Sequence, residues 1–347
     1  MRITLSDIAH KLGMSKSTVS IGLRNDVRLP AATRDKIRRA ATELGYRPDP
    51  NLAAIAAQRW RHRDQRHNVG VALLESASEP APHLRKAYLH HAEARLEQLG
   101  YQVTRFNLDA QPTVAATNRI LIARGIRGVL VPPIYRNDLL AELELPRFSL
   151  AAAGVARWLP PFAAATKDAF EGVSLCLRRM VELGYRRIGV ALLRHEGKVP
   201  DDAHRLGAAL EARQRYGEDG IIIEVWEGRI GDMGSEMTSF AHWYRAKRPQ
   251  AVLAFNRFAL DWIDHAGLPR PGIATLSRFD RASELAGLEP QHQRIAEAAA
   301  ELLDQEIRHH RIGTSLDAPP RLLIPPKWID APSLPPATAV RTQKRVQ

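Results

Sequence analysis

The chain of 347 residues contains one cysteine, and only 6% of its residues are aromatic. The single cysteine, Cys176, excludes an internal disulfide framework and suits a reducing compartment, so we expect a cytoplasmic protein. No apolar run approaches the roughly 20 residues that are needed to span a membrane. Asp7 stands where a secretory signal has its apolar core, which argues against export.

Motifs that carry catalysis or nucleotide binding are also missing. The sequence has no G-x-x-x-x-G-K-[ST], no H-E-x-x-H, no G-x-S-x-G and no C-x-x-C. Two adjacent pairs, His90-His91 and His309-His310, each point to different sides of a helix and cannot form one metal-binding face. We therefore expect no catalytic residue, no metal site and no cofactor.

The net charge of +12 is unevenly distributed along the chain. Residues 1–66 hold 14 Lys and Arg residues against six Asp and Glu residues, and residues 331–347 hold three Lys and Arg residues without an acid. The part between them is nearly neutral. A basic segment on a nearly neutral body is typical of a protein that binds a polyanion with one end.

The stretch from Thr4 to Asn25 predicts two short helices joined by a glycine turn, which is a helix-turn-helix. We expect Ser6 to cap the first helix and Gly13 to end it. The apolar face of this helix comprises Ile8, Ala9 and Leu12.

The second helix is expected to begin at Ser15, which can cap it. Val19 and Leu23 lie four residues apart, so both face inward. A third helix over residues 31–44 closes the core. Outward residues of such a second helix meet base edges in the major groove, while capping amides and basic side chains bind phosphates. The outward residues here are Lys16, Ser17, Ser20, Ile21 and Arg24.

Several phrases occur in a fixed order: T-L-S-D-I-A, G-M-S-K-S-T-V-S, T-R-D-K-I, L-G-Y-R-P and an alanine-rich segment ending in Ile55. In this order and spacing they resemble the head and hinge of the lactose repressor and purine repressor family of bacterial regulators. The resemblance implies that the outward residues bind DNA together with Ser15, Thr18, Arg28, Thr33, Tyr46, Arg47, Asn51, Leu52 and Ile55.

Two positions in the second helix depart from the family pattern. Ile21 stands where an arginine is frequent, so base preference there should depend on apolar contact, such as with a thymine methyl group. Gly22 lies inside the helix, where glycine costs about 1 kcal/mol relative to alanine.

Residues 48–66 are expected to form a hinge and linker. Pro48 and Pro50 stop the third helix. The segment from Leu52 to Gln58 spans about two turns and is too short to remain helical in water without a partner. The resemblance implies that two such hinge helices of a dimer lie in the minor groove, where Ile55 wedges a central base step.

From Asn68 onward the pattern alternates between strands and helices. This alternation predicts doubly wound parallel sheets, and about 250 residues of it suggest two lobes. Strands are expected at residues 69–74, 103–106, 129–132, 148–153, 188–193, 221–226, 252–255 and 273–276. Helices are expected at residues 84–99, 114–124, 170–183, 204–216 and 295–310.

The body resembles a periplasmic sugar-binding protein, which implies a small effector in a cleft between two α/β lobes. Open α/β sheets bind ligands at the carboxyl ends of their strands, where Glu75, Asn256 and Asp280 are expected. Arg205 resembles the arginine that family members place on the effector, and Trp226 could stack on a sugar. A surface or capping role competes with a ligand role at each of the four polar positions.

The predicted layout has four parts. A helix-turn-helix domain at residues 1–47 and the hinge at 48–66 precede a core at 67–330, whose lobes cover about 67–163 and 164–290 before the chain crosses between them. Residues 331–347 are expected to be a disordered basic tail, since they are rich in proline and end in basic residues. This tail lacks leucine heptads, which favours a dimer over a tetramer.

We expect a sequence-specific transcriptional regulator, a repressor that binds a near-palindromic operator as a homodimer and responds to a small molecule. A carbohydrate is the first guess for the effector, although Arg257 and the phrase Ser277-Arg278-Phe279 depart from the family pattern and leave its chemistry open. One alternative is a small-molecule binding protein or enzyme with a vestigial DNA head. Another is an architectural DNA-binding protein without sequence preference.

Overall fold

The computed structural model describes residues 3–23, 29–46, 69–76, 82–110, 113–132, 143–154, 162–196, 199–231, 233–278, 284–313 and 319–337. The chain divides into two compact units. The first comprises residues 1–153, 160–164 and 296–320, and the second comprises residues 154–159, 165–295 and 321–347.

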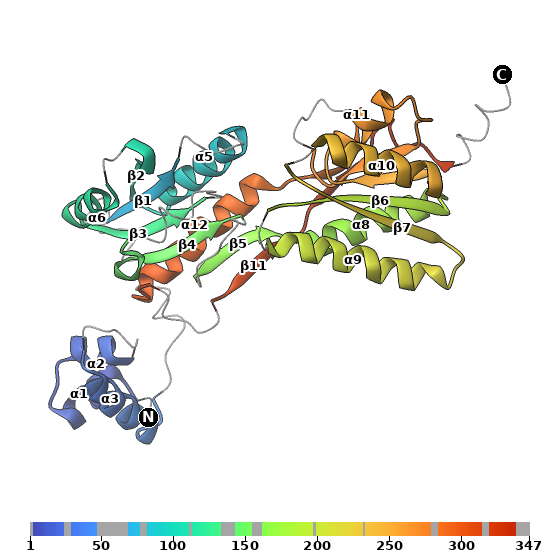
Figure 1. Cartoon of the computed structure of the whole chain (residues 1–347). Helices are drawn as coiled ribbons and strands as arrows, with labels where there is room; N and C mark the ends of the chain where they lie inside the picture. The colour runs from blue at the N-terminus through green and yellow to red at the C-terminus, as the bar shows by residue number, and fades with distance from the viewer. Residues whose placement is uncertain are drawn as a thin grey trace. The chain divides into compact units, whose positions relative to one another are not determined.

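Three helices form the head and surround one small apolar core (Figure 1). Ile8, Val19 and Ile37, one from each helix, are fully buried in it. The predicted inward positions Ile8, Ala9 and Val19 are therefore confirmed. The helices are α1 (Leu5–Leu12), α2 (Lys16–Leu23) and α3 (Ala31–Glu43).

The N-cap of α1 is Thr4, so the prediction of Ser6 was wrong. The Thr4 backbone N donates to a carboxylate oxygen of Asp7 at 2.7 Å, and the Thr4 hydroxyl donates to the same oxygen at 2.8 Å. Hydrogen bonds from Thr4 lower the pKa of Asp7, and the bond from the Thr4 backbone contributes most. Since α1 begins at Leu5, Ser6 already lies within its first turn.

Gly22 is buried against α3, which explains a glycine in the middle of α2. A Cβ added at Gly22 would lie 2.4 Å from Cδ1 of Ile37, well inside van der Waals contact. The close approach of α2 and α3 therefore requires a residue without a side chain at position 22. The helix-propensity cost expected from the sequence is offset by this packing.

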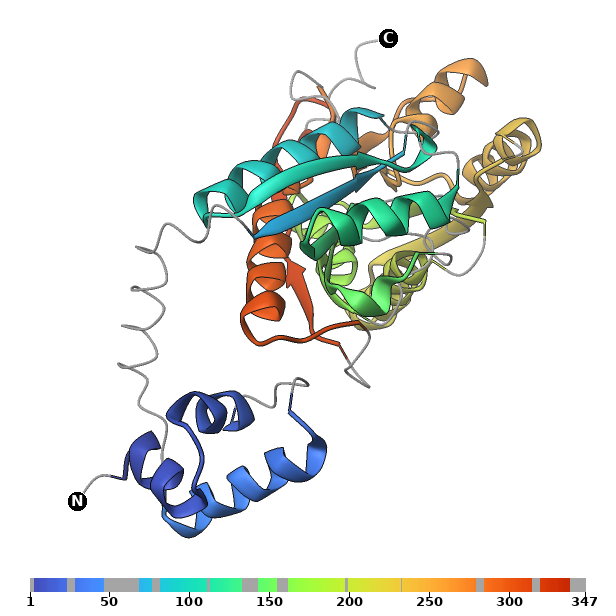
Figure 2. The same cartoon turned by 90° about the vertical axis from the view of Figure 1, so that its left-hand side faces the viewer.

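A six-stranded sheet with the order β11-β5-β4-β3-β1-β2 forms the first α/β part. β1 pairs in parallel with both β2 and β3, and β3 pairs in parallel with β4. Figure 2 shows α5 lying along β1 and β2. The elements up to β5 are β1 (Gly70–Glu75), α5 (Pro82–Gln98), β2 (Gln102–Asn107), α6 (Val114–Ala123), β3 (Ile126–Val131), β4 (Ser149–Ala153) and β5 (Ala163–Lys167).

A second six-stranded sheet has the order β12-β10-β9-β8-β6-β7. Its strands β6, β7, β8, β9 and β10 pair in parallel with their neighbours, and β12 pairs antiparallel to β10. Its elements are α8 (Ala169–Glu182), β6 (Arg187–Arg194), α9 (Pro200–Gly217), β7 (Ile222–Arg229), α10 (Met233–Lys247), β8 (Ala251–Ala254), α11 (Phe258–His265), β9 (Gly272–Thr275), β10 (Ala286–Glu289) and β12 (Lys327–Ile329).

Helices cover both faces of the second sheet (Figure 1). On one face, α8 and α9 enclose a core that contains Leu177, Met180 and the predicted buried Cys176, whose thiol pKa is raised by burial. On the other face, α10 and α11 enclose an aromatic core around Phe240 and Trp262. The chain then forms α12 (His292–Arg308) and returns through β11 (Arg321–Ile324).

The two sheets have the same strand order. Reading each from its second strand, the order is second, first, third, fourth and fifth, with a sixth strand contributed from near the C-terminus. This is a doubly wound order, in which the winding direction reverses between the first and third strands. All eight predicted strands and all five predicted body helices are present, whereas the sequence analysis missed α10, α11, β5, β10, β11 and β12.

The expectation of a disordered tail from residue 331 was wrong for its first seven residues. Leu334 is buried in the core under α8, the Ser333 hydroxyl donates to the Ile273 carbonyl at 2.7 Å, and the Tyr185 hydroxyl donates to the Pro335 carbonyl at 2.5 Å. These contacts bind the segment to the second unit. Residues 338–347 lie outside the described residues.

We predict that Gly22→Ala destabilises the head by about 1–3 kcal/mol, because the added methyl group overpacks the contact with Ile37. Hydrogen exchange of the amides in α1, α2 and α3 measures this change. Gly207→Ala in α9 is the matched control, since a Cβ added at Gly207 would meet no atom within 4 Å and alanine should stabilise that helix. Slower exchange of the head in Gly22→Ala would contradict the packing argument.

Candidate DNA-binding helix and effector site

The second helix of the head presents a polar face to solvent. The Ser15 hydroxyl accepts a hydrogen bond from the Thr18 backbone N at 3.0 Å, so the predicted cap of α2 is confirmed. Ser15, Lys16 and Ser17 are exposed at the start of this helix, and Thr18, Ser20 and Ile21 are partly exposed. Backbone amides, hydroxyls and one ammonium group thus gather at the helix N-terminus, which is the end that favours anions.

Two other predicted DNA-binding residues lie within the described part of the head. Thr33 is partly exposed in the first turn of α3. Tyr46 packs against the apolar core of the head, which gives this ring a structural role in addition to any contact with DNA. The remaining predicted positions lie outside the described residues: Arg24, Arg28, Arg47, Asn51, Leu52 and Ile55.

A group of polar side chains lies where the winding of the second sheet reverses, between β6 and β8. His195 follows β6 directly, and Phe255 and Asn256 follow β8. Their rings and amide are therefore brought together at the carboxyl edge of the sheet, the usual ligand-binding edge of this architecture. The His195 and Phe255 rings meet edge to face, with centroids 5.7 Å apart.

Arg205 of α9 is the buried cation of this group, with 5% of its surface exposed. Its Nη1 donates to Asp202 at 2.8 Å and its Nη2 donates to Asp201 at 3.3 Å. Its guanidinium carbon lies 4.9 Å from the centroid of the Phe255 ring. Two carboxylates and one aromatic ring therefore compensate the desolvation of the charge.

Two further side chains complete what we call the edge cluster, which comprises Lys167, His195, Asp201, Asp202, Arg205 and Phe255. Asp202 accepts from the His195 backbone N at 2.8 Å, and its other oxygen lies 3.0 Å from Nδ1 of the His195 ring. Lys167, the last residue of β5, lies with Nζ 3.3 Å from Asp201. Burial raises the pKa of Asp202, but the hydrogen bonds from His195 and the charge of Arg205 lower it more.

Of the four predicted effector residues, the structure places only Arg205 and Asn256 at this edge. The Asn256 side-chain oxygen accepts from the Phe258 backbone N at 3.0 Å and so caps α11. Glu75 ends β1 in the other unit, half-buried, and Asp280 lies outside the described residues. Trp226 is buried among Phe240, Phe258 and Trp262, so the suggestion that it stacks on a sugar was wrong.

The sequence analysis missed Lys167, His195, Asp201 and Asp202. The carboxylates Asp201 and Asp202 lie four and three residues before Arg205, a spacing that places them on the same face of a helix. That local signal was available. His195 and Lys167 lie at the ends of other strands, and only the fold brings them to the cluster.

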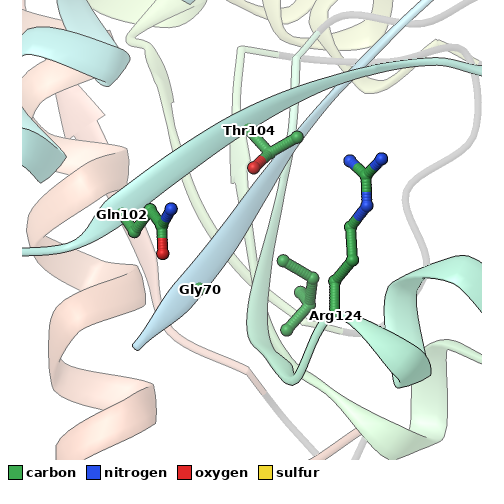
Figure 3. Close-up of a pocket in the computed structure, with 5 residues that line it drawn as sticks. Gly70, Gln102, Thr104 and Arg124 are labelled. Carbon is green, nitrogen blue, oxygen red and sulfur yellow. The ribbon is translucent and has the colours of Figure 1, made fainter. Parts of the chain in front are cut away.

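A pocket of about 290 Å³ lies at the opposite, amino edge of the first sheet (Figure 3). It is lined by Gly70, Gln102, Thr104, Arg124 and Ile126. Because ligands of open α/β sheets bind at the carboxyl edge, this pocket does not coincide with the expected effector position.

The described residues contain neither a membrane-spanning helix nor a metal-binding group. None of their helices is both long and apolar enough to cross a membrane. In the same part of the chain, no three His, Cys, Asp or Glu side chains are grouped so that they could hold a metal ion.

Comparisons with known proteins agree with this architecture. Residues 4–49 match the family model for bacterial regulatory proteins of the lacI family. The regulator GalS of Salmonella typhimurium is 27% identical over 260 residues, 73% of this chain and 72% of its own length. DegA of Bacillus subtilis is 23% identical over 353 residues, 95% of this chain and 97% of its own. The solved lac repressor dimer bound to operator and the anti-inducer ONPF covers 96% of this chain and 100% of its own, at 20% identity and a TM-score of 0.54.

A helix-turn-helix head followed by two doubly wound α/β parts defines a DNA-binding regulator with a core like that of a periplasmic binding protein. The head matches the lacI family of bacterial regulatory proteins over residues 4–49, and the longer matches to the regulators GalS and GalR are 27% and 25% identical. The chain is a transcriptional regulator and not an enzyme.

We predict that Arg205→Met destabilises the second unit by on the order of 3 kcal/mol, because it leaves Asp201 and Asp202 with fewer cationic partners in a buried position. Denaturant unfolding followed by tryptophan fluorescence measures the loss. Arg215→Met removes a solvent-exposed partner of Glu211 from the same helix and should cost less than about 1 kcal/mol. Equal losses in the two variants would contradict a special role for the buried pair.

The loss of stability in Arg205→Met should depend on pH in a defined direction. The pKa of Asp202 is lowered in the folded state, so its ion pairs stabilise the fold above the ordinary carboxylate pKa of about 4. That contribution is lost as the pH falls through the lowered pKa. The difference between the parent and Arg205→Met should therefore be largest near neutral pH and should shrink in acid.

Proposed function

We propose that this regulator is a repressor that binds a near-palindromic operator as a homodimer, in the cytoplasm, and releases it in response to a small molecule. The observation that carries the proposal is the exposed polar N-terminal face of α2, held by the Ser15 cap and by packing on α1 and α3. Such a face on a helix-turn-helix fits the major groove.

The side chains of α2 divide between two kinds of DNA contact. Ser17, Ser20 and Ile21 would meet base edges, with the apolar Ile21 favouring a thymine methyl group. Lys16 and the amides at the helix start would bind phosphates. Specificity therefore depends on few base contacts, and affinity depends mainly on phosphate contacts.

A dimer and a hinge supply the second part of the proposal. The lac repressor structure that resembles this chain is described as a dimer bound to its operator, and this supports the same arrangement here. We propose that residues 48–66 act as the hinge and that Ile55 wedges a central base step, which costs a few kcal/mol of unstacking. The bent DNA then offers further contacts.

The edge cluster is the proposed effector position, because it lies where the winding of the second sheet reverses. An effector that binds the free and the DNA-bound conformations unequally changes the affinity for the operator. The change equals the difference between its two binding free energies, which is commonly about 1–3 kcal/mol. A carbohydrate is the starting candidate. The expectation that Glu75 and Asp280 contact the effector stays a prediction from the sequence.

Selection of random double-stranded DNA by the purified chain at about 150 mM salt tests the proposal. We expect enrichment of an inverted repeat with a flexible central step. Affinity for all sequences alike would favour an architectural protein. Binding of a small molecule without any preference among DNA sequences would favour a small-molecule binding protein or enzyme with a vestigial DNA head.

Within that experiment, Lys16→Ala should weaken binding to selected and unselected DNA alike and should reduce the slope of log affinity against log salt by about 1. Lys11→Ala is the matched control, because Lys11 forms an ion pair with Glu43 at 2.7 Å on the surface of the head. A salt slope that stays the same in Lys16→Ala would remove this side chain from the phosphate contacts.

A further inference from the structure

The pocket at the amino edge of the first sheet has no part in the proposed DNA-binding and effector functions. Three separate stretches of the chain line it: Gly70 begins β1, Gln102 and Thr104 belong to β2, Arg124 caps the C-terminus of α6 and Ile126 begins β3. Figure 3 shows the two β2 side chains and Arg124 around the start of β1. We call these five residues and the space between them the amino-edge pocket.

The size of the amino-edge pocket suits a small molecule. Its volume is about 290 Å³, close to the lower end of ordinary ligand pockets, about 300 Å³. Since one water molecule takes up about 30 Å³ of the liquid, the pocket has room for on the order of ten waters. A ligand with a similar number of non-hydrogen atoms therefore fits.

Gly70 keeps the start of β1 free of a side chain. A Cβ added there would lie 2.9 Å from Cδ1 of Ile126 and 3.6 Å from the Arg124 carbonyl oxygen. The pairing of β1 with β3 also shifts at this point, because Gly70 pairs with Ile126 and Val71 pairs with Gly128. Glycine in a strand often marks such a bulge or a close approach to the backbone. A side chain at position 70 would therefore compete with Ile126 for space at the pocket.

The three polar side chains of the amino-edge pocket are open to a ligand. Gln102 and Arg124 are exposed, and Thr104 is partly exposed. In the part of the chain that the structure describes, the Gln102 amide, the Thr104 hydroxyl and the Arg124 guanidinium have no hydrogen-bond or ion-pair partner. One cavity thus brings together a hydroxyl, an amide and a guanidinium group whose donors are not in use.

Arg124 is the cation of the pocket. Its guanidinium carbon lies over the Phe106 ring, 5.7 Å from the centroid. Phe106 follows Thr104 by two residues on β2, so both side chains lie on the same face of the strand. The ring contact leaves the N–H donors at the rim of the guanidinium group free. Their fork geometry matches the paired oxygens of a carboxylate or a phosphate.

The positive charge of the amino-edge pocket is not compensated by its own residues. On the opposite face of β2, Nε of Arg105 donates to Glu93 at 3.1 Å, so that cation has a carboxylate partner. The amino-edge pocket contains one guanidinium group and no acidic residue. Since a guanidinium group keeps its proton in proteins, the charge does not depend on a titration near neutral pH. A bound anion would neutralise it.

We propose that the amino-edge pocket binds a small oxyanion, which is a carboxylate or phosphate compound with on the order of ten non-hydrogen atoms. Arg124 binds the anionic group. The Thr104 hydroxyl and the Gln102 amide can both donate and accept, and they bind the neighbouring polar atoms of the ligand. This site lies in the first unit, and it is independent of the proposed effector position and of the proposed repressor.

Calorimetry with the full-length protein tests the class of ligand. Inorganic phosphate, pyrophosphate, succinate and citrate are titrated at an ionic strength held constant with sodium chloride, so that each anion has to outcompete chloride. We expect at least one of them to bind at one site per chain with a Kd below about 1 mM. The phosphate and carboxylate members distinguish the two sources of negative charge.

Hydrogen exchange locates the bound anion. In the presence of the preferred anion, we expect slower exchange of the amides at the starts of β1 and β2 and in the turn between α6 and β3. The amides of the head and of the second sheet should exchange as they do without the anion.

Variants assign the binding to Arg124. Arg124→Met should weaken the preferred anion about tenfold or more, whereas Arg124→Lys, which keeps the charge without the fork, should weaken it less. Thr104→Val removes the hydroxyl and should weaken the anion about threefold to tenfold. Arg127→Met is the matched control, because it removes the same charge from an exposed residue of β3 that does not line the pocket.

The outcomes separate this inference from the proposed function. Absence of saturable binding by all four anions, protection of other segments, or equal losses in Arg124→Met and Arg127→Met each overturns the oxyanion site. Protection of the same amides by double-stranded DNA and by none of the small anions would also overturn it, since Arg124 would then contact the DNA backbone. Failure of the DNA selection, with anion binding retained, would overturn the repressor and leave the site intact.

Discussion

A guanidinium group, that of Arg205, is buried at the edge of a sheet in the second unit, and its charge has to be compensated there. Removing Arg205 from water costs several kcal/mol unless hydrogen bonds and opposite charges replace the lost solvation. Asp201 and Asp202 supply those charges from the first turn of the same helix, and Phe255 covers the flat face. His195 and Lys167 then arrange around the two acids, so the geometry of the candidate site follows from compensating one buried charge.

The head could be predicted from the sequence because its signals are local. A cap, a glycine turn and apolar residues at helical spacing follow one another closely along the chain, and the three helices are where the pattern placed them. The errors are also local. Thr4 replaces Ser6 as the cap, since both can accept from the first-turn amides and only the reciprocal bond with Asp7 decides between them. Gly22 looked unfavourable because the sequence does not show how closely α3 approaches.

In the two α/β parts, some strands could not be predicted from the sequence. Apolar runs bounded by turns revealed eight strands, but β5 consists mainly of alanine and threonine, and β11 and β12 have only four and three residues. Such strands are stabilised by their neighbours and carry little pattern of their own. The candidate site depends on those neighbours. Lys167 ends β5, so the strand that the sequence did not reveal also supplies the cation that it did not reveal.

The positive charges of the two functional regions differ in how they are compensated. In the described part of the head, no carboxylate pairs with Lys16, so this cation is open to any polyanion and contributes affinity that salt weakens. In the edge cluster, Lys167 and Arg205 already have carboxylate partners. A surface that is compensated in this way attracts diffuse polyanions weakly and binds only a ligand that fits the remaining donors. The same residue types therefore differ in how open they are to a polyanion: Lys16 lacks a carboxylate partner in the described part of the head, whereas the cations of the edge cluster, the proposed effector position, have theirs.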